Sequence, residues 1–188
     1  MITMKDFVPE KDPILREHAQ EVSFPLSKED YELATKMREF LINSQDEAMA
    51  EKYQLRPGVG VAAPQIGQSK QIFAIYIMDY DEEGNPTEPK VDQIVINPKL
   101  ISHSIEEVAL KDGEGCLSVR RAVPGYVPRP KRAKIKFYDL EGKEHVVKLR
   151  NYEAIVFQHE LDHLKGIMFY DHINLDAPWT HAENVTII

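Results

Sequence analysis

The sequence predicts an α+β fold in which short, mostly antiparallel strands pack around a central helix. Three observations support this prediction. The chain has 188 residues, a usual length for one domain. Only two segments show clear helical periodicity, and several short apolar runs end at turn-forming residues. With 43% hydrophobic and 29% charged residues, the composition is that of a globular protein rather than a disordered one. We expect residues 1–188 to form a single domain.

The first expected helix follows an irregular segment, residues 1–25, that contains three of the 12 prolines. Ser27 begins a capping-box pattern, with Asp30 in place of the usual Glu or Gln. Apolar residues then recur at helical spacing: Leu33, Met37, Phe40 and Leu41. We expect this helix to end between Asn43 and Ala50, and Arg56-Pro57-Gly58 to allow no helix beyond it.

The strands are expected to follow. Ile72 to Met78 is a continuous apolar run, which predicts a buried strand. Residues 79–90, DYDEEGNPTEPK, are acidic and rich in turn formers, which predicts an exposed loop. The segments 134–138 and 145–149 flank Leu140-Glu141-Gly142-Lys143 and are expected to form a hairpin. Other short strands are expected at 94–96, 105–110 and, in the tail, 185–188.

The second expected helix runs from Tyr152 to Lys165 and is closed by Gly166. It contains His159-Glu160-Leu161-Asp162-His163, an H-E-x-x-H motif. Residues four apart lie about 40° apart on a helix, so both imidazoles can bind one metal ion. Glu160 lies about 100° round from His159. A carboxylate there flanks the ligands without being one, which is the position that a general base needs.

The apolar pattern of this helix bears on the metal site. The buried side is marked by Val156, Phe157, Leu161 and Leu164, and the solvent side by Gln158, Asp162 and Lys165. Glu160 and His163 fall on the buried side. An inward carboxylate is costly unless something compensates its charge, and a divalent cation would do so. The alternative is a surface helix whose histidines and glutamate are only solvated.

A third protein ligand is needed, because catalytic zinc-type sites usually have three and one open position. The position at which a metzincin motif would place a histidine is Phe169. Glu183 and Cys116 remain as candidates. Cys116 lies in Glu114-Gly115-Cys116-Leu117-Ser118, where glycines allow close backbone approach, and a thiolate binds borderline or soft metals tightly. A lone cysteine can also be a small buried apolar residue.

The segment GVGVAAPQIG, residues 58–67, is uncharged and rich in small residues. Its glycines permit a positive φ or close contact with a ligand, and Gln65 offers an amide donor among apolar neighbours. The segment is not a phosphate loop, because it lacks the G-K-[ST] ending. Taken alone, it is equally typical of a buried turn before a strand.

Together, GVGVAAPQIG, EGCLS and QHELDH resemble, in this order, the three signature motifs of peptide deformylases. That family is metal-dependent and removes the N-formyl group from the first methionine of bacterial nascent chains. The resemblance runs from Asp12 to the end of the second helix. The length, the acidic insertion at 79–90 and the tail resemble the second, Gram-positive subclass. Val61 and Pro64 replace the Leu and Thr of some relatives, and neither removes a group that the chemistry needs.

The resemblance implies a role for each matching residue of this single catalytic domain. Cys116, His159 and His163 would be metal ligands, and Glu160 the general acid/base. Gln65 and the backbone N–H of Leu117 would bind the developing oxyanion, and Gly60 the substrate backbone. The methionine pocket would be lined by Val59, Tyr152, Ile155 and Val156. The expected metal is Fe²⁺, with Ni²⁺, Co²⁺ or Zn²⁺ able to replace it.

Composition predicts the surroundings in which the protein works. No apolar run approaches the roughly 20 residues of a membrane helix, and the first residues lack the apolar stretch of a signal peptide. With a single cysteine, Cys116, no internal disulfide can form. We therefore expect a cytoplasmic protein without a membrane partner. The net charge of −8 also argues against DNA binding.

One stretch departs from this acidic character. Residues Arg120 to Lys136 contain seven Lys or Arg and no acid. Either they contact ribosomal RNA near the exit tunnel, where nascent substrates emerge, or they form a solvated strand face with Lys134 and Lys136 pointing outward.

Two other functions remain open from the sequence. A zincin-like metalloprotease would use H-E-x-x-H with a distal acidic ligand, cleave internal peptide bonds and not require Cys116. A non-catalytic metal-binding or redox-sensing protein would have a closed fourth ligand and no need for Glu160.

Overall fold

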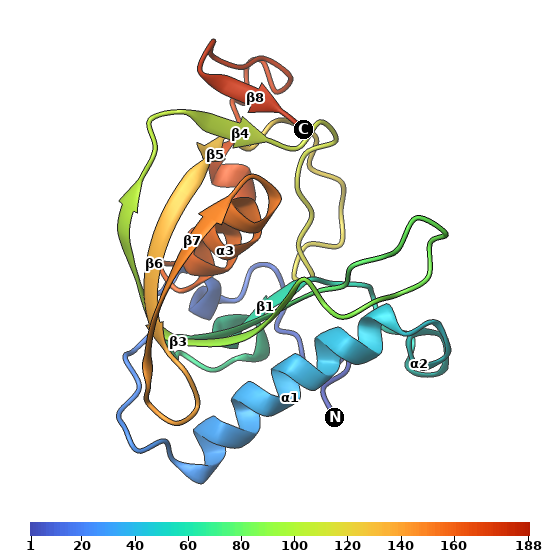
Figure 1. The fold of residues 1–188 in the computed structure, drawn as a ribbon, viewed down its shortest axis with the longest axis vertical. Coiled ribbons are helices and arrows are strands. Elements are labelled where there is room, and N and C mark those ends of the chain that lie inside the picture. The colour runs from blue at the N-terminus through green and yellow to red at the C-terminus, as the bar shows by residue number, and fades with distance from the viewer.

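The computed structural model describes residues 1–188 and contains three α-helices, eight strands and three short 3₁₀ helices (Figure 1). The helices are α1 (Lys28–Gln45), α2 (Glu47–Tyr53) and α3 (Tyr152–His163). The strands are β1 (Gly60–Ala62), β2 (Ile72–Ile77), β3 (Val91–His103), β4 (Glu107–Ala109), β5 (Arg129–Pro130), β6 (Arg132–Tyr138), β7 (Glu144–Arg150) and β8 (Val185–Ile187). None of the helices has the length and hydropathy needed to cross a membrane.

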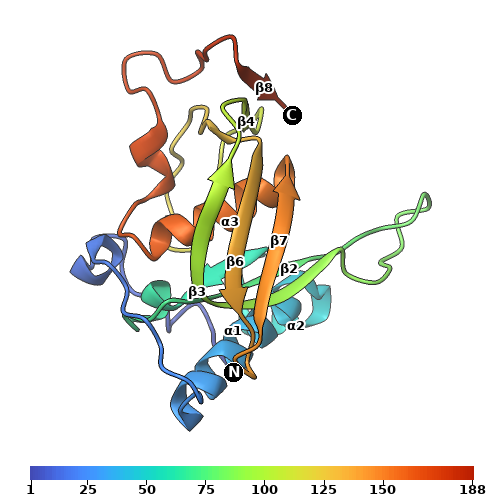
Figure 2. The same ribbon diagram turned by 60° about the vertical axis from the view of Figure 1, so that its left-hand side comes forward.

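The strands form two sheets around α3. Five antiparallel strands have the order β1-β2-β3-β6-β7, and a smaller sheet has the order β5-β4-β8, in which β4 and β8 are parallel. Helix α3 lies in the middle of the molecule, enclosed by strands of both sheets, while α1 lies outside β1 and β2 (Figures 1 and 2). The predicted α+β class, with mostly antiparallel strands around a central helix, is confirmed.

Strand β2 is buried on both faces, which explains its continuous apolar sequence. Ile72 and Ala74 belong to the apolar cluster that α1 covers. Phe73 and Ile75 belong to the cluster around α3, where Phe73 meets Phe157 edge to face at 6.0 Å between ring centroids. Alternate residues of one strand therefore hold the two long helices on opposite sides of the sheet.

Helix α1 begins as predicted. The Ser27 hydroxyl oxygen accepts a hydrogen bond from the Asp30 N–H at 3.1 Å. The helix ends at Gln45, within the predicted range, and a second short helix that the sequence did not predict follows before Arg56. Asp46 accepts a hydrogen bond from the Met49 N–H at 2.8 Å and begins α2. One aspartate thus ends the first helix and caps the second.

The predicted strand at 94–96 is much too short. Asn97, with φ 48°, and Pro98 interrupt the pattern, yet β3 continues to His103 through register shifts. The Asn97 side chain accepts from the Val22 N–H at 2.9 Å and donates to the Val22 C=O at 2.8 Å, which fixes the irregularity against the N-terminal segment. The other expected strands and the β6–β7 hairpin are present within a few residues of their predicted bounds.

The predicted solvent side of α3 was wrong in part. Gln158 is buried, and its Nε2 donates to the Pro130 C=O at 2.9 Å. Asp162 is half-buried and forms an ion pair with Arg129. Only Lys165 is exposed as predicted. Strand β5 covers this flank of the helix, and the helical periodicity of α3 alone carries no information about that strand.

Candidate active site

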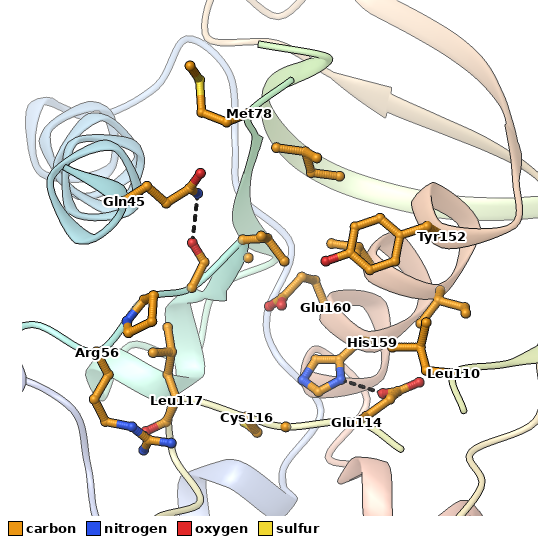
Figure 3. Close-up of a pocket in the computed structure, with 18 of the residues that line it drawn as sticks. Gln45, Arg56, Met78, Leu110, Glu114, Cys116, Leu117, Tyr152, His159 and Glu160 are labelled. Atoms are coloured by element: carbon orange, nitrogen blue, oxygen red, sulfur yellow. Dashed lines mark hydrogen bonds and ion pairs between the residues drawn. The ribbon is translucent and has the colours of Figure 1, made fainter. Parts of the chain in front are cut away.

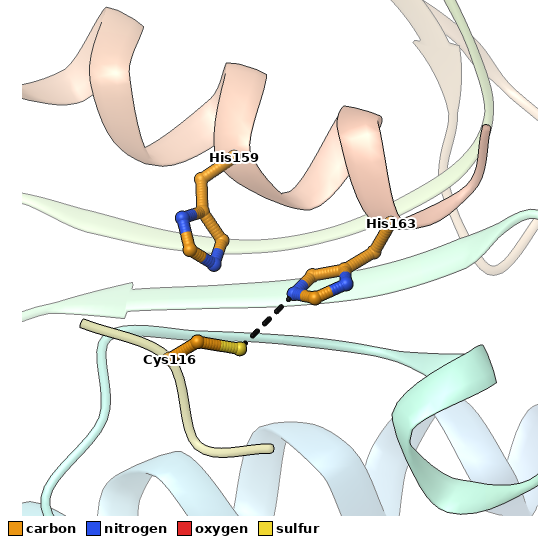
Figure 4. A group of neighbouring side chains, drawn as sticks. All are labelled: Cys116, His159 and His163. Atoms are coloured by element: carbon orange, nitrogen blue, oxygen red, sulfur yellow. Dashed lines mark hydrogen bonds between the residues drawn. The ribbon is translucent and has the colours of Figure 1, made fainter. Parts of the chain in front are cut away.

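Three predicted metal ligands converge in the interior of the protein. His159 and His163 lie one turn apart on α3, and Cys116 faces them from the loop between β4 and β5 (Figure 4). Their potential ligand atoms all lie within 4.8 Å of one another, and Cys116 Sγ is 3.4 Å from His163 Nε2. Glu183, the other candidate ligand, is exposed in the C-terminal tail and is not part of this group.

The surroundings favour a thiolate at Cys116. Burial alone would raise the pKa of this thiol, but the neighbouring imidazoles of His163 and His159 lower the pKa well below its ordinary value. A thiolate and two imidazoles form a donor set that suits borderline divalent metals such as Zn²⁺, Fe²⁺, Co²⁺ and Ni²⁺. The residues present therefore fit a divalent metal ion.

A buried carboxylate orients one of the imidazoles. His159 Nδ1 donates to Glu114 Oε2 at 2.8 Å, which turns Nε2 towards the cluster (Figure 3). Glu114 is held by Arg129 through contacts of 2.6 and 3.0 Å, and Arg129 also pairs with Asp162 at 2.8 Å. Burial disfavours the Glu114 carboxylate, but the charge of Arg129 and the bond from His159 outweigh it, and the pKa is about 2.

No local sequence pattern predicted these supporting charges. Arg129 was counted in the basic stretch 120–136, but its side chain is only 3% exposed. The rest of that stretch contains the predicted alternation, with Ala133 and Ile135 buried and Lys134 and Lys136 turned outward. The only indication that Glu114 has a role was its position in the sequence two residues before Cys116. No local pattern predicted that Arg129 would be buried.

Glu160 is buried beside the cluster and is 4% exposed. Burial raises its pKa to about 7, although the nearby imidazoles oppose the shift. Its Oε2 has no hydrogen-bond partner in the protein. A Cβ added to Gly60 would overlap the Glu160 carboxylate, so the β1 backbone lies directly against this side chain. Only glycine fits between this strand and the acid.

Two N–H donors, the side-chain amide of Gln65 and the backbone N–H of Leu117, point to the same region. Gln65 is almost fully buried; its Oε1 accepts from the Ala62 N–H at 2.9 Å, and its Nε2 lies 3.0 Å from Ser118 Oγ and 3.4 Å from Cys116 Sγ. The Leu117 N–H has no hydrogen-bond partner within the protein. Both donors therefore lie close to the Cys116 end of the site.

A pocket of about 550 Å³ opens onto this group (Figure 3). Ten of the predicted site residues line it, and the eleventh, His163, lies in the metal cluster. The ten are Val59, Gly60, Gln65, Cys116, Leu117, Tyr152, Ile155, Val156, His159 and Glu160. The wall also includes residues that no motif predicted, among them Gln45, Arg56, Met78, Tyr80 and Leu110. These residues come from segments far apart in the chain.

The fold and the site define an α+β metallohydrolase, with a buried Cys-His-His group and a carboxylate at one end of an open pocket. Comparison with known proteins narrows this class. Residues 4–179 match the family model described as polypeptide deformylase, and the chain belongs to that family. Members of this family are metalloenzymes that hydrolyse N-formyl groups from nascent peptides.

Curated relatives match the whole chain. A peptide deformylase of Latilactobacillus sakei is 53% identical over 100% of both chains, and a peptide deformylase 2 of Bacillus cereus is 54% identical over 98% of this chain and 97% of its own. Among solved structures, a probable peptide deformylase from a Synechococcus phage is 35% identical, with a TM-score of 0.68 over 89% of this chain and 98% of its own. The family resemblance predicted from the three motifs is confirmed, and of the three functions left open it is deformylation that is supported.

Proposed function

We propose that this pocket binds the formylated N-terminus of nascent peptides, with Cys116, His159 and His163 holding the metal ion and Glu160 moving the proton. The observation that carries the proposal is the convergence of three ligand atoms within 4.8 Å beside a buried carboxylate in an open pocket. Fe²⁺ is the expected ion by resemblance to the family, and the donor set also suits Ni²⁺, Co²⁺ and Zn²⁺. Because the substrates are nascent chains, we place the reaction in the cytoplasm.

A bound divalent ion would lower the pKa of water to about 7 and polarise the formyl oxygen. Glu160 takes the proton of the attacking water as the water oxygen bonds to the formyl carbon. It then gives this proton to the leaving amine as the C–N bond breaks. The products are formate and a methionine with a free amino group. The unpaired Oε2 of Glu160 is free to accept the proton.

Two N–H donors of the protein would stabilise the negative charge that develops on the formyl oxygen. They are Gln65 Nε2, whose amide is oriented by the Ala62 N–H, and the unpaired N–H of Leu117. One such preorganised donor is worth about 2.7–4 kcal/mol of transition-state stabilisation. Both donors are oriented before the substrate binds, and Gln65 Nε2 would exchange its 3.4 Å bond to Cys116 Sγ for one to the oxyanion.

The substrate backbone would lie along β1, which is an edge strand of the large sheet. The Tyr76 N–H donates to the Val59 C=O at 2.9 Å, and Gly60 lies opposite Ile75. In an antiparallel pair the next residue along points its N–H and C=O away from the partner strand. The polar groups of Gly60 therefore face the open edge, where a peptide can pair with them. The methionine side chain would contact Val59, Tyr152, Ile155 and Val156.

The proposal is tested by formate release from N-formyl-Met-Ala-Ser, with protein purified anaerobically with Fe²⁺ or loaded with Ni²⁺. The matched control is Glu160→Gln, which keeps the size of the side chain and removes its basicity. We expect rapid release by the wild type and release at least about 10²-fold slower by the variant, with equal metal content. Full activity of Glu160→Gln would overturn the assigned role, and cleavage of unformylated internal peptide bonds would favour the metalloprotease.

We also propose a contact with ribosomal RNA, on the outer face of β6 and β7. Arg132 lies opposite Arg150, and Lys134 lies opposite Lys148, although like charges in register destabilise a strand pair. Of these four, only Arg132 has an ion-pair partner, Glu106. Three unpaired cations on one strand face of an acidic protein suit a phosphate backbone.

Ribosome co-sedimentation tests this contact. We expect wild-type binding to fall steeply between about 50 and 200 mM salt and to be lost when Lys134 and Lys148 are both changed to Glu. The charge-matched control is Lys11→Glu with Lys28→Glu, two exposed residues in other parts of the chain. Equal sedimentation of both double variants would contradict the proposal.

A further inference from the structure

Gln45, the last residue of α1, bridges two backbone carbonyls beside the pocket. Its Nε2 donates to the Gly58 C=O at 2.9 Å (Figure 3) and to the Tyr76 C=O at 2.8 Å. The neighbouring Ser44 Oγ accepts from the Gly58 N–H at 3.3 Å. The end of α1 thus satisfies both polar groups of Gly58 and links the segment before β1 to the end of β2.

The bond to Tyr76 has a specific effect on strand pairing. The Tyr76 N–H donates to the Val59 C=O at 2.9 Å. In a regular antiparallel pair, two facing residues exchange two hydrogen bonds, so the Val59 N–H would also donate to the Tyr76 C=O. That carbonyl instead accepts from Gln45, and the Val59 N–H has no partner within the protein. Gln45 therefore takes the acceptor that would close the ladder and leaves a backbone donor free at the pocket wall.

The segment lies in close contact with two residues of the site. A Cβ on Gly58 would lie 2.8 Å from Leu117 Cδ1, and one on Gly60 would overlap Glu160. The strand therefore touches the residue that bears one proposed oxyanion donor and the residue that moves the proton. These contacts hold the Gly58–Gly60 backbone against the site without Gln45, so loss of Gln45 is expected to change strand pairing rather than the distances to these two residues.

We propose that Gln45 is a positioning residue, which ends the β1–β2 ladder at Val59 and so keeps the Val59 N–H available to the peptide substrate. The inference rests on the proposed pairing of the peptide with the edge of β1. Gln45 touches neither the metal ligands nor Glu160 in this arrangement, so its contribution is to peptide binding rather than to the chemical step.

The test compares Gln45→Met, which keeps the length of the side chain and removes both donors, with Gln68→Met, the same change at an exposed residue. For N-formyl-Met-Ala-Ser we expect Gln45→Met to raise KM about tenfold, the effect of losing roughly one hydrogen bond, with kcat within about twofold of the wild type. Gln45→Glu should raise KM further, because a carboxylate would face two carbonyl oxygens. Gln68→Met should leave both constants unchanged.

Amide hydrogen exchange at Val59 gives a readout that does not depend on turnover. In the wild type the product peptide Met-Ala-Ser should slow this exchange. In Gln45→Met the ladder can close, so the amide should exchange slowly without the peptide and change little when it is added. An unchanged KM would overturn the proposal. So would a fall in both kcat and melting temperature with no change in Val59 exchange, which would indicate a general structural role for Gln45. Activity retained by Glu160→Gln would instead refute the proposed function, so the two failures are distinct.

Discussion

The two sides of the pocket are held in place by different interactions. On the metal side, α3 and the loop of Cys116 are joined by buried ion pairs, in which Arg129 bridges Glu114 and Asp162. On the peptide side, β1 is held by neutral hydrogen bonds from Gln45 and Ser44 and by close contacts at glycines.

This difference follows from what each side must do. Ligands of a metal ion need one fixed orientation, and charges in a low-dielectric interior are stable only with fixed partners. A strand that pairs with many peptides instead needs free backbone donors and acceptors. Neutral hydrogen bonds from side chains hold the segment before β1 and leave such groups free along its edge. Changes on the metal side should therefore alter metal content and stability. Changes on the peptide side should alter kinetics and leave the metal in place.

The largest effect is expected from Cys116→Ala. Removing the thiolate leaves two imidazoles, too few to hold a catalytic ion tightly. Metal content after dialysis should fall to near zero, and formate release should fall with it. The matched control for metal content is Ser118→Ala, a neighbouring change that removes no ligand; formate release is not compared with it, because Ser118 Oγ accepts from Gln65 Nε2. Full activity of Cys116→Ala with stoichiometric iron would contradict the metal assignment.

Gln65→Leu should have the next largest effect. It removes one proposed oxyanion donor while keeping a side chain of similar size. We expect kcat to fall about 10²- to 10³-fold, with metal content unchanged. Steady-state kinetics together with metal analysis checks this. A rise in KM alone would show that Gln65 binds the ground state and the transition state equally.

Gly60→Ala should lower kcat/KM by about 10²-fold. The new Cβ must displace either β1 or the Glu160 carboxylate. A displacement of about 1 Å in an active site has an effect of this size. Metal content and melting temperature should change little. Kinetics and thermal unfolding of the metal-loaded variant measure this. Wild-type kinetics would show that the contact between Gly60 and Glu160 is not needed for activity.

Arg129→Met should have the smallest effect on activity but the largest on stability. It leaves Glu114 buried without its cation, which should lower the free energy of unfolding by about 3–5 kcal/mol. The loss of support for His159 should weaken metal affinity or activity about 10- to 100-fold. Denaturant unfolding and metal competition measure the two quantities. The exposed Arg120→Met is the control, and equal stability of the two variants would contradict a structural role for the buried ion pairs.

Much of the fold was predictable from local sequence. The Ser27 cap, the periodicity of α1 and α3, and the turn between β6 and β7 act over a few residues, and the structure contains all of them. Helix α2 and the length of β3 were missed. Their determinants are an aspartate with two roles and an Asn97 side chain that binds Val22, 75 residues earlier.

The sequence by itself determined which residues could meet at the site. The spacing of His159 and His163 places them on one helical face, and the family resemblance carried by three motifs predicted eleven residues of the pocket wall and the metal cluster. Only the tertiary structure decided that Arg129 is buried and that Gln45 ends a strand ladder. The physical reason is that the burial of a charge, and the partner of a backbone carbonyl, depend on groups that are distant in the chain and that folding brings together.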